Sequence, residues 1–303
     1  MHWGDRRGFL KASGAAILLG AAGCAREDLR LVRERQGRQR DHDSEGGIGG
    51  TGVFGPVTDL GSIIVAGRRI ATPEGLLARS PFGPAPADAI PVGAVVSALA
   101  REEADGLVAE AIDVVTALAG PVTAISGNPG RFDVMGVRVR APRSLRAVGR
   151  DGRPEMLSAL RVGDRVAVSG LWRQGDVVAT RVERLGPGAP DVASGLLFAD
   201  DDAPRIEGLR LAATPEGGFG FVVARGRWRP GAGFEAALID RRGLSPFPGV
   251  AARAVVDGFM ARDPVGQGHH MAGVGLPRDR ASDAPALVGV RALFEGRLVL
   301  RGD

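Results

Sequence analysis

Hydrophobic and polar residues alternate along much of this chain, in short stretches that end at glycine. Residues 165–172 (RVAVSGLW) place Val166, Val168 and Trp172 on one face. A period of two residues predicts a half-buried β-strand. The next residues, RQGD at 173–176, predict a turn into a second alternating stretch. The pattern therefore favours an all-β protein.

The alternating stretches recur along the chain. Residues 65–70 (VAGRRI) return as 134–139 (VMGVRV), and residues 92–96 (VGAVV) return as 162–166 (VGDRV), in both cases about 70 residues later. A shorter third copy and a fainter fourth copy follow. A constant offset of this kind indicates tandem structural units. We therefore expect about four β units, at residues 53–116, 117–186, 190–243 and 250–303, of which the last is the weakest.

Each unit is long enough for four or five short strands joined by glycine turns. This is the size of a small closed or partly open β-barrel such as an OB-fold. Closure would also remove the exposed edges that valine-rich strands otherwise present to solvent. The predicted fold class is therefore all-β, with about four tandem OB-like barrel units.

Composition and charge narrow the picture further. The 303 residues include 47 glycines and 20 prolines, which disfavours long helices. The formal net charge is +4, and residues 1–23 hold three basic residues and one acidic residue, so the remainder carries +2. A nearly neutral chain lacks the basic surface on which nucleic-acid binding depends. We therefore predict no nucleic-acid partner.

The chain begins with an arginine pair in the sequence DRRGFLK, followed by an uncharged stretch rich in alanine and glycine. This start resembles a twin-arginine export signal, in which the export receptor reads Arg6, Arg7, Phe9 and Leu10. The apolar stretch is too short for a stable membrane span. The resemblance implies that residues 1–23 form a signal peptide and that the protein is exported.

The signal ends in LGAAGC, which contains Cys24, the only cysteine of the chain. This ending resembles a bacterial lipobox, in which the cysteine receives a diacylglyceryl group, and several acyl chains on one residue anchor a protein stably. The residue that follows is Ala25 rather than the aspartate of inner-membrane lipoproteins, which implies an anchor in the outer membrane, on its periplasmic face. Residues 24–52 would then be the lipidated cysteine and a flexible tether. Alternatively, Cys24 merely ends a conventional signal peptide.

Four segments also resemble a known family. They are GGIGGTG at 46–52, LGSIIVAG at 60–67, VGDRVAV at 162–168 and ATRVE at 179–183. They are similar to the bacterial envelope family catalogued as domain of unknown function 5666, and the similarity covers the first two units better than the last two. The resemblance implies tandem small β-domains. It supplies no activity and no functional residues.

The chain holds few residues suited to covalent catalysis. Residues 25–303 contain no lysine and no tyrosine, and the only cysteine precedes them, which excludes Schiff-base, thiolate and tyrosine acid–base chemistry. No G-x-S-x-G motif marks a nucleophilic serine. We therefore predict a non-catalytic protein without a cofactor, whose units bind an envelope protein or polysaccharide, or act as a scaffold. An enzyme that takes up a cofactor before export is an alternative, because the twin-arginine route carries folded proteins.

A second alternative is a periplasmic protein that binds copper or another soft metal. His269, His270 and Met271 are consecutive, and imidazole and thioether groups are ligands suited to copper. Successive residues of a regular strand point to opposite faces, so both histidines could bind one metal only from a loop. Otherwise they are ordinary surface histidines.

Two tryptophan–arginine pairs occupy matching places in the second and third units, where GLWR corresponds to GRWR. The pairs are Trp172 with Arg173 and Trp228 with Arg229. One interpretation is a stacking and cation–π shelf for a sugar or another flat ligand. The other is structural: each tryptophan closes its barrel, and the neighbouring arginine covers the edge of the ring.

Overall fold

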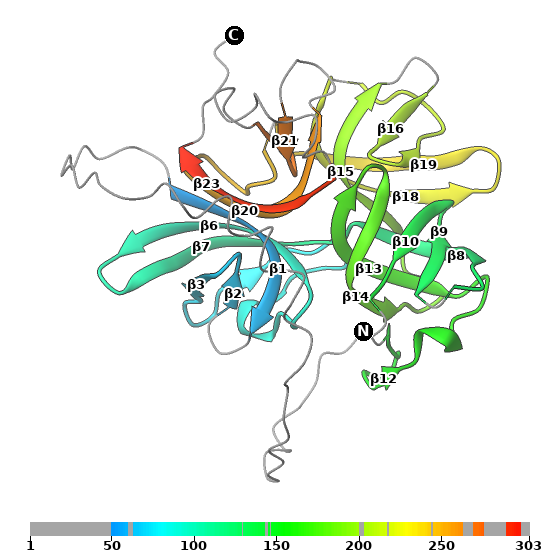
Figure 1. Ribbon diagram of the computed structural model, residues 1–303, viewed down its shortest axis with the longest axis horizontal. Helices are drawn as coiled ribbons and strands as arrows, with labels where there is room; N and C mark the ends of the chain where they lie inside the picture. Colours follow the sequence, from blue (N-terminus) through cyan, green and yellow to red (C-terminus); the bar gives the residue numbers. More distant parts are fainter. Residues whose placement is uncertain are drawn as a thin grey trace. The chain divides into compact units, whose positions relative to one another are not determined.

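The protein is described by a computed structural model, shown in Figure 1. It describes residues 50–59, 63–128, 130–142, 145, 147–199, 203–216, 218–243, 245–262, 269–275 and 289–297. Regular structure within these residues consists of β-strands and two short 3-10 helices. The predicted all-β class is therefore confirmed.

The first set of strands pairs in a circuit. Its members are β1 (Gly50–Asp59), β2 (Ile63–Val65), β3 (Arg68–Ala71), β6 (Val95–Glu103) and β7 (Gly106–Val115). Strand β1 pairs with β2, β2 with β3, β3 with β7, β7 with β6, and β6 with β1. The β3–β7 pair is parallel and the others are antiparallel. The pairing thus returns to the strand at which it began.

The second set repeats this circuit. Its members are β8 (Leu118–Ile125), β9 (Arg131–Val134), β10 (Val137–Arg140), β13 (Arg165–Arg173) and β14 (Asp176–Arg184). Strand β8 pairs with β9, β9 with β10, β10 with β14, β14 with β13, and β13 with β8. The β10–β14 pair is again the parallel one.

The third set follows the same order, and the four described strands of the fourth set agree with it. The third contains β15 (Asp191–Ala199), β16 (Pro204–Ile206), β17 (Leu209–Arg210), β18 (Gly220–Arg229) and β19 (Gly233–Arg241), and a parallel bridge from Leu211 to Phe234 completes its circuit. The fourth contains β20 (Ala251–Arg262), β21 (His269–Met271), β22 (Val274–Gly275) and β23 (Arg291–Arg297). Within it, β20 pairs with β21 and β23, and β21 pairs with β22.

One tight turn recurs in all four sets, between the second and third strands. Its first residue is Ala66, Met135, Glu207 or Ala272, and each has a φ between 49° and 53° although none is glycine. The second residue is glycine in every case. Left-handed backbone at both residues, as in Ala66–Gly67, Met135–Gly136 and Ala272–Gly273, is typical of two-residue hairpin turns, whose twist matches that of the strands they join. A left-handed residue followed by glycine thus joins the second and third strands in each set of described strands.

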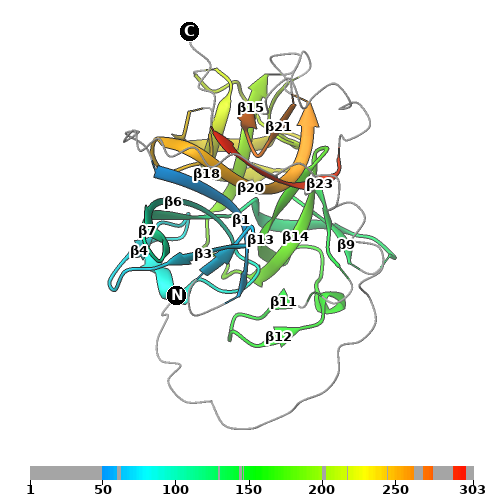
Figure 2. The same cartoon turned by 60° about the vertical axis from the view of Figure 1, so that its left-hand side comes forward.

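The sets also pair with one another. Strand β1 runs parallel to β20, which joins the first and fourth sets in a nine-stranded sheet. Strand β8 pairs with β15, which joins the second and third sets in a twelve-stranded sheet. Figure 1 shows the first pairing, with β20 and the red β23 beside the blue β1, and Figure 2 gives a second view. Strand pairing therefore connects the first set to the fourth and the second set to the third.

Two longer segments between strands contain short ordered elements. Residues 73–90 include β4 (Leu77–Ala78), β5 (Ala85–Pro86) and the 3-10 helix η2 (Ala87–Ala89). Residues 145–160 include β11 (Ala147–Val148), β12 (Pro154–Glu155) and η3 (Leu157–Ala159). The buried Ala87 and Ile90, and Ala147 and Leu160, belong to the cores of the first and second sets. Apolar anchors at the ends of these segments thus fix them on the strands.

Strand β13 illustrates how alternation becomes packing. Val166 and Val168 lie in one hydrophobic cluster, against which Trp172 also packs, as the alternation predicts. The opposite face is buried too, because Leu171 packs in a different cluster together with Phe54 and residues of β20. The neighbouring strand set thus covers the face that the pattern alone would leave to solvent.

Candidate functional site

The hairpin formed by β18 and β19 carries a row of arginines. Arg225, Arg227 and Arg229 are exposed, whereas Ala224 lies in the core and the half-buried Trp228 packs against it. Strand β18 pairs without interruption along this stretch, because the bulge near Arg225 adds its extra residue to β19. The three arginines therefore share one face, with neighbours about 7 Å apart along the strand.

An open groove of about 450 Å³ lies along this row. The three arginines line one side, together with Pro190, and β19 supplies Glu235, Ala236, Ala237 and Leu238. Leu238 is 57% exposed, so the groove has an apolar rim beside its charged row. The groove therefore combines charge with a small hydrophobic surface.

The charge of the groove is positive. Arg229 Nε donates a hydrogen bond to Glu235 Oε2 at 2.8 Å, which neutralises one arginine. The guanidinium groups of Arg225 and Arg227 form no hydrogen bond or ion pair within the described part of the chain. Guanidinium groups stay protonated and bind carboxylates or phosphates through two parallel hydrogen bonds. The groove is thus suited to binding an anion, and a guanidinium has no acid–base function at neutral pH.

The buried carboxylate of Asp191 binds the backbone of β18 between Arg227 and Arg229. Asp191 is 4% exposed and accepts a hydrogen bond from the backbone N–H of Trp228 at 2.7 Å. Its other oxygen accepts from Arg165 Nη2 at 2.5 Å. Asp191 therefore ties β18 to β15 and β13, and it fixes the backbone from which Arg227 and Arg229 project.

Sequence reasoning selected Arg229 but missed Arg225 and Arg227. The signal was available in the segment ARGRWR, where arginine recurs at every second residue of a predicted strand. Alternation could not show which face of the strand lies against a neighbour, because the corresponding face of β13 is buried. Solvent exposure of the arginine row follows from the tertiary structure.

The two tryptophans are structural residues of the second and third sets. Both are half-buried and pack against the same hydrophobic cluster, and Trp172 Nε1 donates to the carbonyl oxygen of Ser194 at 2.7 Å. Their arginines turn away from them: Arg173 lies 5.3 Å from the ring centre of Phe259, and Arg229 binds Glu235. Successive strand residues point to opposite faces, so the predicted tryptophan–arginine shelf is not assembled within the described part of the chain.

The three residues of the predicted metal site lie on β21. His269 and His270 are both buried, so the interpretation as surface histidines is wrong. His270 Nδ1 accepts a long hydrogen bond of 3.5 Å from Gly273 N, whereas both ring nitrogens of His269 are buried without a partner. Because they are consecutive in a strand, the histidines face opposite sides, and Met271 lies on the side of His269. No group of three or more His, Cys, Asp or Glu suited to a metal occurs among the described residues.

Glu207 is a titratable residue that sequence reasoning missed. It occupies the tight turn of the third set, where its Oε1 accepts a hydrogen bond from Leu196 N at 3.2 Å. Burial raises the pKa of Glu207 to about 7, although this hydrogen bond acts in the opposite direction. A turn position predicts an exposed carboxylate, whereas this one is half-buried, with its side chain against Leu196 and Gly195.

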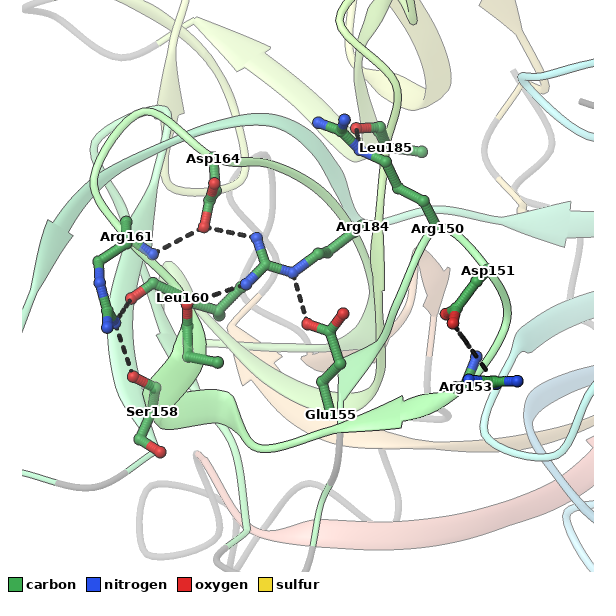
Figure 3. A network of polar contacts seen from close by, with 11 residues as sticks. Arg150, Asp151, Arg153, Glu155, Ser158, Leu160, Arg161, Asp164, Arg184 and Leu185 are labelled. Carbon is green, nitrogen blue, oxygen red and sulfur yellow. Dashed lines mark hydrogen bonds and ion pairs between the residues drawn. The ribbon is translucent and has the colours of Figure 1, made fainter.

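A polar network holds the segment around η3 on β14, as Figure 3 shows. Arg184 donates to Glu155 Oε2 and Asp164 Oδ2, each at 2.6 Å, and to the carbonyl oxygen of Ala159 at 2.9 Å. Burial raises the pKa of Asp164, but hydrogen bonds from Arg161 N and Arg184 outweigh it and lower the pKa overall. Every member of the network is engaged with another, so its role is structural.

The export and lipidation residues lie outside the described residues. These are Arg6, Arg7, Phe9, Leu10 and Cys24. In the part of the chain that the structure covers, no helix has the length and apolar character needed to cross a membrane.

Comparison with known proteins identifies one segment. Residues 119–183 match the model of the family described as domain of unknown function, DUF5666. The match runs from β8 to β14 and so covers the second circuit of strands. Searches of curated proteins and of solved structures found no match to the chain.

Proposed function

We propose that this protein is an exported, lipid-anchored component of the bacterial envelope whose tandem OB-like barrels form a non-catalytic binding module. The observation that carries the proposal is the open groove on β18 and β19, in which two arginines lack an acidic partner among the described residues. The one carboxylate of the groove, Glu235, is held by Arg229. Such a surface is suited to binding rather than to chemistry.

The order of strand pairing supports the barrel interpretation. In the first set the strands pair in the order one, two, three, five, four and back to one, with the third and fifth strands parallel. A five-stranded barrel of this kind is the architecture of OB-folds. The second set has the same order, and a bridge between Leu211 and Phe234 completes it in the third.

The N-terminal residues support the location. A twin-arginine signal would deliver the folded chain across the inner membrane, and acylation of Cys24 would hold it at the periplasmic face of the outer membrane. The residues between Cys24 and β1 would form the tether. The binding module would then be held near the membrane by its lipid, facing envelope proteins or polysaccharides.

The anchor is tested by fractionating the producing cells. The wild type is expected in the outer membrane, with a mass equal to residues 24–303 plus acyl groups. Cys24→Ala should release the protein into the periplasm, and Arg6→Lys with Arg7→Lys should leave it unprocessed in the cytoplasm. Recovery of both variants in the outer membrane at the wild-type level would overturn the proposal.

A second candidate is soft-metal binding at β21, and one observation favours it. Both ring nitrogens of His269 are buried without a hydrogen-bond partner, which is unusual for a native structure. A bound metal ion would satisfy one of them, with Met271 on the same side of the strand. Titration of the full chain with copper tests this. Equal affinity in the wild type and in His269→Ala would exclude the site, and His270→Ala is the matched control on the opposite face.

A further inference from the structure

We propose that the arginine row of β18 binds a linear carboxylated polysaccharide, which lies along the groove between Arg225 and Arg229. The inference rests on the proposed binding function and specifies its ligand and its site. Three features support this ligand: the charge of the row, its difference from the equivalent rows of the first two sets, and the composition of the groove.

The equivalent rows are defined by a shared bulge. The bulge falls between Leu99 and Ala100 in the first set, between Ser169 and Gly170 in the second, and between Arg225 and Gly226 in the third. The residues that correspond to Arg225, Arg227 and Arg229 are therefore Leu99, Arg101 and Glu103 in the first set, and Ser169, Leu171 and Arg173 in the second.

The first two rows are not suited to an anion. In the first set, Arg101 Nε donates to Glu103 Oε1 at 2.8 Å, so the row neutralises itself. In the second set, the middle position is Leu171, which is 3% exposed and packs against other apolar residues. Of the three rows that share this bulge, only that of the third set presents three exposed arginines, with Glu235 as an acidic neighbour. The charge is thus a property of this hairpin and not of the repeat.

The groove favours a carboxylated sugar chain over a nucleic acid. Single-stranded nucleic acids bind by stacking their bases on aromatic side chains. The residues that line this groove include none, since Trp228 turns to the core and the apolar rim consists of Ala236, Ala237 and Leu238. Clusters of basic residues bind acidic polysaccharides such as heparin as well as nucleic acids. The absence of aromatic rings from the lining of this groove therefore favours the polysaccharide. Arginines about 7 Å apart can each pair with a carboxylate of one extended chain.

The experiment measures binding of the full chain, in mild detergent, to polygalacturonate. Neutral dextran and oligothymidylate of similar length are the comparison polymers. The Arg225→Ala, Arg227→Ala double variant should bind polygalacturonate at least about tenfold more weakly, with a shallower dependence on salt because fewer counterions are released. The corresponding lysine double variant keeps the charge and should bind more tightly than the alanine variant. Arg101→Ala, the matched control in the first hairpin, should bind as the wild type does.

The possible results distinguish an error in the proposed site from an error in the proposed ligand class. Equal affinity for polygalacturonate in the wild type and in the alanine double variant would overturn the site. Tighter binding of oligothymidylate or dextran than of polygalacturonate, or no binding of polygalacturonate, would overturn the ligand class. Neither result changes the fractionation of Cys24→Ala, so failure of this inference is distinguishable from failure of the proposed envelope location. Unchanged thermal unfolding of the variants confirms that they are folded.

Discussion

Asp113 and Arg242 form a salt bridge between two strand sets that are far apart in the sequence. Arg242 Nη1 lies 2.7 Å from Asp113 Oδ2, and the side chains are 13% and 9% exposed. Asp113 belongs to β7, whereas Arg242 directly follows β19. Arg79 donates two further hydrogen bonds to Asp113, so both carboxylate oxygens are engaged. The pair joins the nine-stranded sheet to the end of the arginine-bearing hairpin.

Removing Asp113 should strongly destabilise the protein. Among the described residues, Asp113→Ala leaves the largely buried guanidinium of Arg242 with the exposed Asp240 as its one remaining ion-pair partner. Loss of one member of a buried pair costs about 3–5 kcal/mol. Urea unfolding should show a lower midpoint at an unchanged slope. Glu295→Ala, which removes an exposed pair with Arg68, should cost at most about 1 kcal/mol. Equal costs for the two variants would contradict the role given to Asp113.

Glu207 should make the protein less stable as the pH rises through neutrality. Its pKa in the fold is about 7, above the ordinary value of 4.5, so folding favours the protonated form. This contribution is complete below about pH 4.5 and is lost as the pH rises through 7, up to about 3 kcal/mol. In Glu207→Gln this loss of stability should be absent. The free energy of unfolding of the variant, relative to that of the wild type, should therefore increase between pH 5 and pH 8.

The measurement is urea unfolding of the wild type and Glu207→Gln across this pH range. Glu74→Gln, at an exposed position, is the control and should follow the wild type at every pH. A constant difference between Glu207→Gln and the wild type from pH 5 to pH 8 would mean that Glu207 has an ordinary pKa.

Asp164 should make the protein less stable as the pH falls into the acidic range, which is the opposite of the effect of Glu207. Its folded pKa lies below the ordinary value of 3.8, so its contribution is present above that pH and is lost as the pH falls through the lower folded value. Asp164→Asn is expected to cost about 1 kcal/mol at pH 7, since the side chain is partly exposed to solvent. Thermal unfolding should show this cost shrinking toward pH 2. Asp88→Asn, an exposed residue of η2, should show no such dependence.

Gly208 should not tolerate a side chain. A Cβ at this position would overlap the carbonyl oxygen of Gly175, because the tight turn of the third set crosses the β13–β14 turn there. Gly208→Ala should therefore destabilise the protein by about 1–3 kcal/mol. Gly186 has open space around it, so Gly186→Ala should be neutral or slightly stabilising. Chemical denaturation of the two variants tests the crossing, and equal stabilities would show that the two turns do not meet.

The candidate site was partly predictable. Trp228 and Arg229 were identified as a pair, and Trp228 packs on the core while Arg229 lines the groove. The predicted stacking of the pair was not found, because consecutive strand residues point to opposite faces. Alternation in the sequence places Arg225 and Arg227 on one face of a strand, but it does not show whether that face is exposed. The equivalent residue of the second set, Leu171, is buried against another strand set.

The sequence by itself determined the local features of this protein: the all-β class, the repeat at a nearly constant offset, and glycine turns such as the one at residues 173–176. These depend on neighbours within a few residues along the chain. The tertiary structure alone decided that β1 pairs with β20, that Asp113 contacts Arg242, and that Glu207 is half-buried while Arg227 is exposed. An alternating strand has the same period whether its outer face meets solvent or another sheet, and that choice is made by contacts between residues far apart in the sequence.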